Sequence, residues 1–303
     1  MNWLDAVLMG IIEGLTEFLP VSSTGHLILL GDRLGQNSPA AKTLEIVIQL
    51  GAVLAVCVYY RERLARLIKG LIARDPAALR LTFALGLAFV PAAVIGLLTH
   101  KAIKELLFHP APVAGALIVG GVLMIAVDVG RKRRGKPGDD GLEQVSLKRA
   151  LAIGIGQCLS LWPGSSRSMT TIVAAEISGL TPSTAADFSF LLAIPTLGAA
   201  TVYDLVKNYK TLASTPGALN ALAIGLVVSF VVALAVIAAF LRYLKRFGLA
   251  PFGVYRIALG VIVLLTLGAS GNAPSNGSGA LNASTAASAT AAATTAGSTA
   301  APQ

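Results

Sequence analysis

Two glutamates four positions apart, Glu13 and Glu17, stand inside an apolar stretch near the start of the chain. On a helix this spacing places both carboxylates on one face, and ionisable groups at membrane depth are costly enough to indicate a function. Two neighbouring carboxylates repel each other unless a proton or a cation is shared between them. A hard divalent cation, Mg²⁺ or Ca²⁺, would relieve this repulsion and would also bind phosphate oxygens. The alternative is a carboxylate pair that lies solvated and idle near the membrane surface.

A short polar run follows the second glutamate, directly after Pro20. Its members are Ser22, Ser23, Thr24 and His26. The hydroxyls here can cap a new half-helix, whose amide N–H groups and positive dipole end form an anion site. The histidine lies within a turn of the serines, where it could act as a base, an acid or a nucleophile. The alternative is that the hydroxyls only cap the helix and the histidine is structural.

A second apolar segment is broken in the same way at residues 163–166, Pro-Gly-Ser-Ser. Arg167 follows, and because its guanidinium is always charged and matches phosphate oxygens in shape, it indicates an anionic ligand. The other residues expected to contact this ligand are Gly164, Ser166, Ser168 and Thr171. Their hydroxyls would donate hydrogen bonds, and the glycine would let the backbone approach closely. A salt bridge from Arg167 to Glu13 or Glu17 is an alternative that does not exclude the binding role.

The elements that must position these residues are apolar helices. Of the 303 residues, 55% are hydrophobic and 13% are charged, whereas soluble domains average about 45–50% and about 25%. The mean hydropathy is +0.74, which excludes an ordinary soluble domain. The net charge of +9 comes mostly from cations between apolar runs. We therefore interpret this charge as a signal of membrane topology and expect no nucleic-acid partner.

Six apolar windows are long enough to cross a membrane: 43–60, 81–98, 113–129, 188–203, 219–241 and 252–267. The broken stretches 4–34 and 147–180 favour re-entrant pairs of half-helices. We therefore expect an all-α polytopic membrane protein with one integral membrane domain, residues 1–268, and a basic cytoplasmic loop at 131–146. Residues 270–303 carry no charge and are nearly all Ala, Ser, Thr, Gly and Asn, which predicts a disordered tail.

The chain also repeats itself at an offset of 143 residues. Residues 20–23 correspond to 163–166, and the windows that follow end in tyrosines at the same offset. Sixteen of the 24 cations fall in loops on one side, so the positive-inside rule places these loops in the cytoplasm and both termini outside. The repeats, about 1–130 and 147–268, therefore begin on opposite sides and are predicted to be inverted, with their broken helices meeting near the membrane midplane.

The runs from Glu13 to His26 and from Pro163 to Ser168 resemble the motifs of the undecaprenyl-diphosphate phosphatases, the bacitracin-resistance type of bacterial membrane protein. The resemblance covers residues 1 to about 268. It implies hydrolysis of undecaprenyl diphosphate, a polyprenyl lipid, to the monophosphate and inorganic phosphate. It also implies a divalent cation and a site open to the outer face of the cytoplasmic membrane. The carrier lipid would be recycled for peptidoglycan synthesis, and bacitracin resistance would follow because the lipid that the drug targets is removed.

The resemblance also implies a role for each motif residue. Glu13 and Glu17 match the metal and acid–base carboxylates, Ser23 and His26 the nucleophile and proton-transfer candidates, and Ser166, Arg167 and Thr171 the phosphate clamp. The residues alone leave the attacking group open between Ser23, His26 and water, and they leave the oligomeric state open, a homodimer included. An inverted-repeat transporter of the same lipid is an alternative, since it needs a similar anion site. Phosphatases that use a histidine downstream of a Ser-Arg pair are excluded, because no histidine follows Arg167.

Overall fold

The computed structural model describes residues 3–33, 39–107, 109–135, 138–214 and 217–271. Within these ranges the regular elements are helices, apart from one isolated bridge between Asp139 and Leu180. Residues 1–264 form one compact unit. The all-α prediction is therefore confirmed, whereas the tail predicted at 270–303 falls outside the described residues from position 272 onward.

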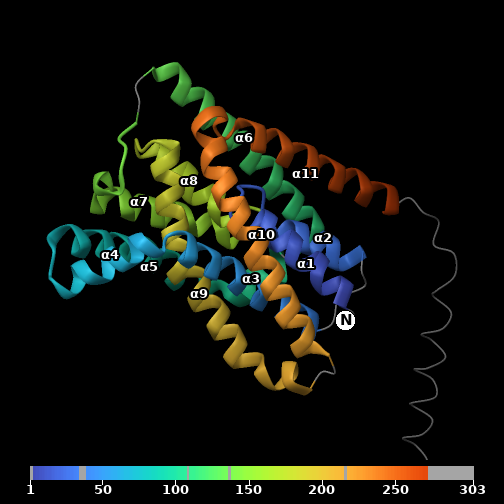
Figure 1. The fold of residues 1–303 in the computed structure, drawn as a ribbon. Coiled ribbons are helices and arrows are strands. Elements are labelled where there is room, and N and C mark those ends of the chain that lie inside the picture. The colour runs from blue at the N-terminus through green and yellow to red at the C-terminus, as the bar shows by residue number, and fades with distance from the viewer. Residues whose placement is uncertain (1–2, 34–38, 108, 136–137, 215–216, 272–303) are drawn as a thin grey trace, which may run out of the picture. The chain divides into compact units, whose positions relative to one another are not determined.

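The helices follow one another as shown in Figure 1. They are α1 (Trp3–Thr16), α2 (Ser23–Arg33), α3 (Pro39–Tyr59), α4 (Arg61–Ile72), α5 (Pro76–Leu107), α6 (Pro110–Arg134), α7 (Leu147–Gln157), α8 (Arg167–Ile177), α9 (Pro182–Ser214), α10 (Ala218–Phe247) and α11 (Ala250–Gly271), with 3₁₀ turns η1 (Leu142–Gln144) and η2 (Cys158–Leu161). Five of them, α5, α6, α9, α10 and α11, contain stretches long and apolar enough to cross a membrane. The remaining predicted span is α3, whose described apolar part, Val47–Tyr59, is shorter. The chain is thus a multi-pass helical membrane protein.

Both predicted breaks interrupt helices. Residues 17–22 separate α1 from α2, and residues 162–166 separate η2, at the end of α7, from α8. Pro20 and Pro163 lie in these gaps, where the proline ring and the missing N–H disfavour a continuous helix. We call residues 17–22 the first break and residues 162–166 the second break.

A serine with an unusual backbone caps the half-helix after each break. Ser22 has φ of 74° and Ser166 has φ of 70°, a left-handed conformation that costs a non-glycine residue about 1–3 kcal/mol. Their hydroxyls accept hydrogen bonds from the amides of Gly25 and Met169, each at 3.2 Å. The caps are 144 residues apart, one more than the offset of the letter pattern. The difference arises between the proline and its cap, which are two residues apart in the first break and three apart in the second, where Gly164 has φ of 94°.

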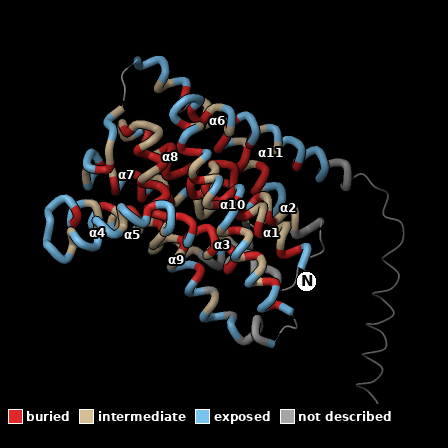
Figure 2. The backbone as a smooth tube through the Cα atoms, in the orientation of Figure 1, coloured by how far each residue is buried: buried red, intermediate tan, exposed pale blue. Residues whose placement is uncertain are grey.

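The second half of the chain follows the helix order of the first half, with α4 as the exception. The series α1, α2, α3, α5 and α6 is matched by α7, α8, α9, α10 and α11. The packing is reciprocal, because α1 packs against α10 while α7 packs against α5. Helix α10, orange in Figure 1, also contacts α3 and α9. Buried residues gather around α8 and α10 in Figure 2, so the breaks lie next to the interior of the bundle.

Cations that the sequence analysis assigned to loops lie largely on helices. Residues 131–134, predicted as the start of the cytoplasmic loop 131–146, form the last turn of α6, which Gly135 ends in a left-handed conformation. Cations are favoured in such a turn because the carboxyl end of a helix carries partial negative charge. Of the six basic residues between 61 and 80, four lie on α4, which has no buried residue: Arg61, Arg63, Arg66 and Lys69.

Candidate active site between the two helix breaks

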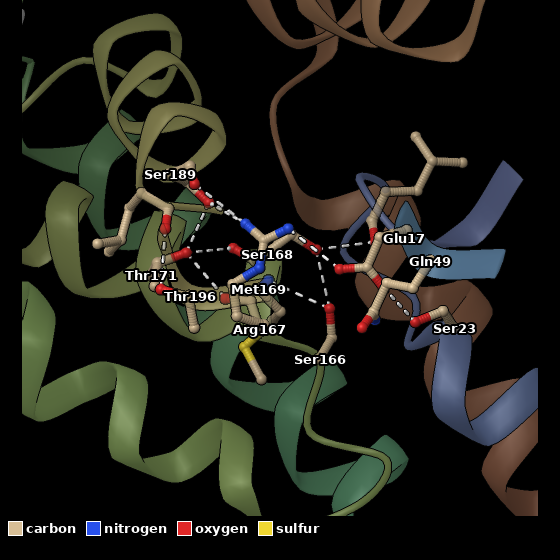
Figure 3. Close-up of polar contacts among 12 residues, drawn as sticks. Glu17, Ser23, Gln49, Ser166, Arg167, Ser168, Met169, Thr171, Ser189 and Thr196 are labelled. Atoms are coloured by element: carbon tan, nitrogen blue, oxygen red, sulfur yellow. Dashed lines mark hydrogen bonds and ion pairs between the residues drawn. The ribbon is translucent and has the colours of Figure 1, made fainter. Parts of the chain in front are cut away.

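Arg167, the first residue of α8, reaches Glu17 of the first break (Figure 3). Its Nη2 donates to Glu17 Oε1 at 3.1 Å, and the two side chains are only 7% and 4% exposed. The salt bridge considered in the sequence analysis therefore exists. Ser168 adds a second link between the breaks, because its Oγ donates to the carbonyl oxygen of Leu19 at 3.0 Å. Residues that are far apart in the sequence thus form one buried site.

Ser23 approaches the other oxygen of the same carboxylate. Its Oγ donates to Glu17 Oε2 at 2.5 Å, and Gln49 of α3 donates to this oxygen from Nε2 at 3.2 Å. A short hydrogen bond from a hydroxyl to a carboxylate is charge-assisted and strong. A hydroxyl held by a base, with the base oriented by a third group, is the arrangement that activates a nucleophile. Here the hydroxyl of Ser23 donates to the Glu17 carboxylate, and Arg167 holds the other oxygen of that carboxylate, which is the geometry this arrangement needs.

The guanidinium of Arg167 is held from its opposite side by α9. Its Nη1 donates to the backbone oxygen and to the hydroxyl of Ser189, at 3.0 and 3.2 Å. Thr171 Oγ1 lies 2.6 Å from the Ser189 hydroxyl, and the Phe18 ring faces the guanidinium at 5.6 Å. Among the described residues, Arg167 Nε has no hydrogen-bond partner although it is buried. The arginine is therefore fixed in place, and its Nε–H is still available as a donor.

The other residues predicted to bind phosphate differ in their placement. Ser166 and Ser168 lie beside Arg167, with their hydroxyl oxygens 2.9 Å apart. Position 164 requires glycine, because a Cβ there would lie 2.6 Å from the carbonyl oxygen of Val113 and the φ of this residue is positive. Thr24, in contrast, is exposed on α2. The second break and the first turns of α8 thus supply most of the predicted clamp.

His26 is engaged away from the Ser23–Glu17 hydrogen bond. Its Nδ1 lies 2.7 Å from the carbonyl oxygen of Ser22, and its Nε2 lies 2.7 Å from the hydroxyl of Tyr255. Because a carbonyl only accepts, Nδ1 carries the proton, and in the neutral ring Nε2 accepts from Tyr255. The two rings are parallel with centroids 5.8 Å apart. In this structure both nitrogens of His26 therefore have partners other than the predicted nucleophile.

The carboxylate pair predicted to bind a metal is buried. Glu13 is 1% exposed, and the amide of Glu17 donates to its carbonyl oxygen at 3.0 Å, which keeps the two residues one helical turn apart. Among the described residues, no three His, Cys, Asp or Glu side chains gather as a metal site. However, Mg²⁺ is commonly held by one or two carboxylates together with substrate phosphates. The donor chemistry of the pair therefore fits a hard divalent cation that shares phosphate oxygens.

Comparison with known proteins identifies the family. The model of the family described as "Bacitracin resistance protein BacA" matches residues 6–262. The chain belongs to this family. A relative from Sorangium cellulosum named undecaprenyl-diphosphatase is 68% identical over 264 residues, covering 87% of this chain and 86% of the relative. Relatives of the same name from Nitrosomonas europaea and Aromatoleum aromaticum are 48% and 47% identical, covering 88% and 86% of this chain and 96% and 93% of theirs.

The part of the chain that matches the BacA family also contains site residues that the sequence analysis missed. They are Gln49 and Ser189, which contact Glu17 and Arg167, together with Tyr255 and Arg256 at the start of α11. Arg256 is completely buried and lies in a predicted span. An ionisable residue in such a span indicates function by itself, so this signal was present in the sequence. The other three residues are single polar side chains without a diagnostic spacing.

Proposed function

We propose that this member of the BacA family hydrolyses undecaprenyl diphosphate to undecaprenyl phosphate and inorganic phosphate. The observation that carries the proposal is the buried series Ser23–Glu17–Arg167, in which a hydroxyl and a guanidinium bind the two oxygens of one carboxylate. The relatives named undecaprenyl-diphosphatase support the same substrate. The product would re-enter peptidoglycan synthesis as the carrier lipid. Removal of the diphosphate lipid would also account for the resistance to bacitracin that gives the family its name.

In the proposed mechanism Ser23 attacks the terminal phosphorus, and Glu17 takes its proton across the 2.5 Å hydrogen bond. The bond from this phosphorus to the bridging oxygen breaks, and undecaprenyl phosphate leaves with that oxygen. Glu17 passes this proton to the departing oxygen and is a carboxylate again. Water then attacks the phosphoserine, Glu17 takes a proton from the water and gives it to the serine oxygen, and the bond from phosphorus to that oxygen breaks, so that inorganic phosphate is released and the serine is restored. Arg167 stabilises the charge that develops on the phosphoryl oxygens, for which its unpartnered Nε is a donor. A water molecule held in place of the serine oxygen would use the same carboxylate.

A divalent cation, Mg²⁺ or Ca²⁺, is part of this proposal. Glu13 and Glu17 would hold it, since both are buried oxygen donors one turn apart. When bound, such a cation neutralises diphosphate charge and polarises phosphoryl oxygens. The residues at the two breaks would orient the lipid head group and transfer the proton.

We also infer that the halves of the chain are inverted repeats in the bacterial cytoplasmic membrane, with the site open to the outer face and both termini outside. The shared helix order and the reciprocal packing of α1 on α10 and α7 on α5 support this topology. Labelling with a membrane-impermeant thiol reagent tests it in intact cells. Thr24→Cys should react from outside, whereas Arg66→Cys on α4 should react only after the membrane is opened. A mass measurement in detergent decides whether the protein is a monomer or a homodimer.

The decisive experiment measures inorganic phosphate released from undecaprenyl diphosphate by the purified protein in detergent, with and without EDTA. Release that EDTA stops and Mg²⁺ or Ca²⁺ restores is the expected result. Release that EDTA does not affect would contradict the cation. A folded sample that binds the lipid but releases no phosphate would contradict hydrolysis and favour the transporter.

A further inference from the structure

Arg256 of α11 is a buried arginine whose hydrogen bonds all go to backbone carbonyl oxygens. Its side chain is 0% exposed. Nη1 donates to Pro20 of the first break at 3.2 Å, and Nη2 donates to Gly164 of the second break at 2.8 Å. The remaining bonds go to α6, from Nη2 to Ala116 at 3.0 Å and from Nε to Leu117 at 3.3 Å.

These four bonds place one rigid group between the two halves of the site. Pro20 lies three residues from Glu17 and three from Ser23, and Gly164 lies three residues before Arg167. The planar guanidinium carries its donors in a fixed fork, so the separation of the two carbonyls follows from its shape. The bonds to α6 fix the position of the fork. Lysine could not replace it, because its donors radiate from a single flexible point.

We propose that Arg256 is a positioning residue that ties the first break to the second and keeps Ser23 and Glu17 in register with Arg167. The inference rests on the proposed function of this site. Phosphoryl transfer needs the attacking oxygen and the phosphate-binding arginine in one geometry, and a misplacement of about 1 Å costs about 10²-fold in rate. Loss of the hydrogen bonds from Arg256 to the two breaks should therefore lower kcat much more than it changes KM.

The α6 helix offers a way to move Arg256 without replacing it. A Cβ at Gly120 would lie 2.4 Å from Arg256 Nη2 and 2.8 Å from Met169 Cε, so Gly120→Ala should displace the guanidinium and leave its charge intact. Gly115 lies on the same helix, and a Cβ there would meet nothing within 4 Å. Gly115→Ala is therefore the matched control, because it makes the same change in helix propensity and does not contact Arg256.

The first readout is kinetic, for the wild type and for Gly115→Ala, Gly120→Ala and Arg256→Lys. We expect kcat per folded molecule to fall about 10²-fold in the last two, with KM little changed, and to stay at the wild-type level in Gly115→Ala. Wild-type kcat in Arg256→Lys would overturn the proposal, because charge alone would then suffice. A raised KM with unchanged kcat would also overturn it, as would a loss of folded protein with normal kcat per folded molecule.

The second readout does not depend on activity. Spin labels at Thr24→Cys and Leu159→Cys, both at exposed positions, in a Cys57→Ser and Cys158→Ser background, report the distance between the elements flanking the two breaks. We expect one narrow distance distribution with Gly115→Ala and a broader or displaced one with Gly120→Ala and with Arg256→Lys. Identical distance distributions in all these variants would overturn the proposal that Arg256 holds the two breaks together, even if the protein proved not to be a phosphatase. A changed distribution with an inactive wild type would contradict only the proposed function.

Discussion

The Glu17–Arg167 pair gives the sharpest test of the site, through Glu17→Gln and Arg167→Gln made singly and together. Both side chains are almost fully buried, at 4% and 7% exposure, so solvent screens their charges little. Removing one partner of a buried ion pair leaves the other charge uncompensated and costs about 3–5 kcal/mol of unfolding free energy. The double variant removes both charges, and we therefore expect its cost to fall well below the sum of the single costs.

The assay combines unfolding in mixed micelles with phosphate release from undecaprenyl diphosphate. Arg61→Gln is the control, because Arg61 and Glu62 form an ion pair at 3.7 Å with side chains 70% and 81% exposed, where a loss below about 1 kcal/mol is expected. Turnover should be abolished in all three site variants while they remain inserted in the membrane. Additive single costs, or a single cost no larger than that of the control, would refute the reasoning. Full turnover in either single variant would remove that residue from the site.

Two further predictions concern the first break. Ser23→Ala should lower phosphate release by about 10³-fold or more, because the attacking group is lost. His26→Ala should lower phosphate release less, since the ring nitrogens of His26 contact Ser22 and Tyr255. Equal losses of phosphate release in the two variants would contradict Ser23 as the nucleophile. Ser22→Ala and Ser22→Gly both lose the hydrogen bond to the Gly25 amide, but only glycine adopts a φ of 74° without strain. The unfolding free energy of the alanine variant should therefore lie about 1 kcal/mol below that of the glycine variant, and the reverse order would show that the cap is not strained.

The sequence predicted the parts of the site that break a local rule. Prolines inside apolar runs marked both breaks, and Glu17 and Arg167 were visible because charge is rare at membrane depth. The partners of these residues could not be predicted, because they depend on which helices pack together. Gln49 and Ser189, for example, are ordinary polar residues of long helices until α3 and α9 pack beside the breaks.

Arg256 was missed for a different reason. It stands alone in its apolar window, with no acidic residue at helical spacing to suggest an ion pair. Its partners are backbone oxygens made available where helices break and at α6. Carbonyl groups leave no signature in a sequence, so the charge could be flagged from the window but its role could not be assigned.

The charges of the site also predict how the cation binds. Glu13 and Glu17 are balanced by Arg167 and Arg256, all four buried, so little net charge remains to attract a cation. A diphosphate adds several negative charges to this interior, where uncompensated charge is costly. We therefore expect the cation to bind weakly alone and at least about tenfold more tightly with a non-hydrolysable diphosphonate lipid, which corresponds to a coupling of about 1.4 kcal/mol.

Electron paramagnetic resonance of Mn²⁺ measures this coupling without turnover, by titration of the protein with and without the diphosphonate lipid. Glu13→Gln removes one of the two carboxylates that would hold the cation. It should therefore weaken Mn²⁺ binding in the presence of the lipid. A monophosphonate lipid is the matched control, because it brings less negative charge and should strengthen Mn²⁺ binding less. Equal Mn²⁺ affinity with and without the diphosphonate would show that the protein alone provides the cation site, and the charge balance argued from the two arginines would then be wrong.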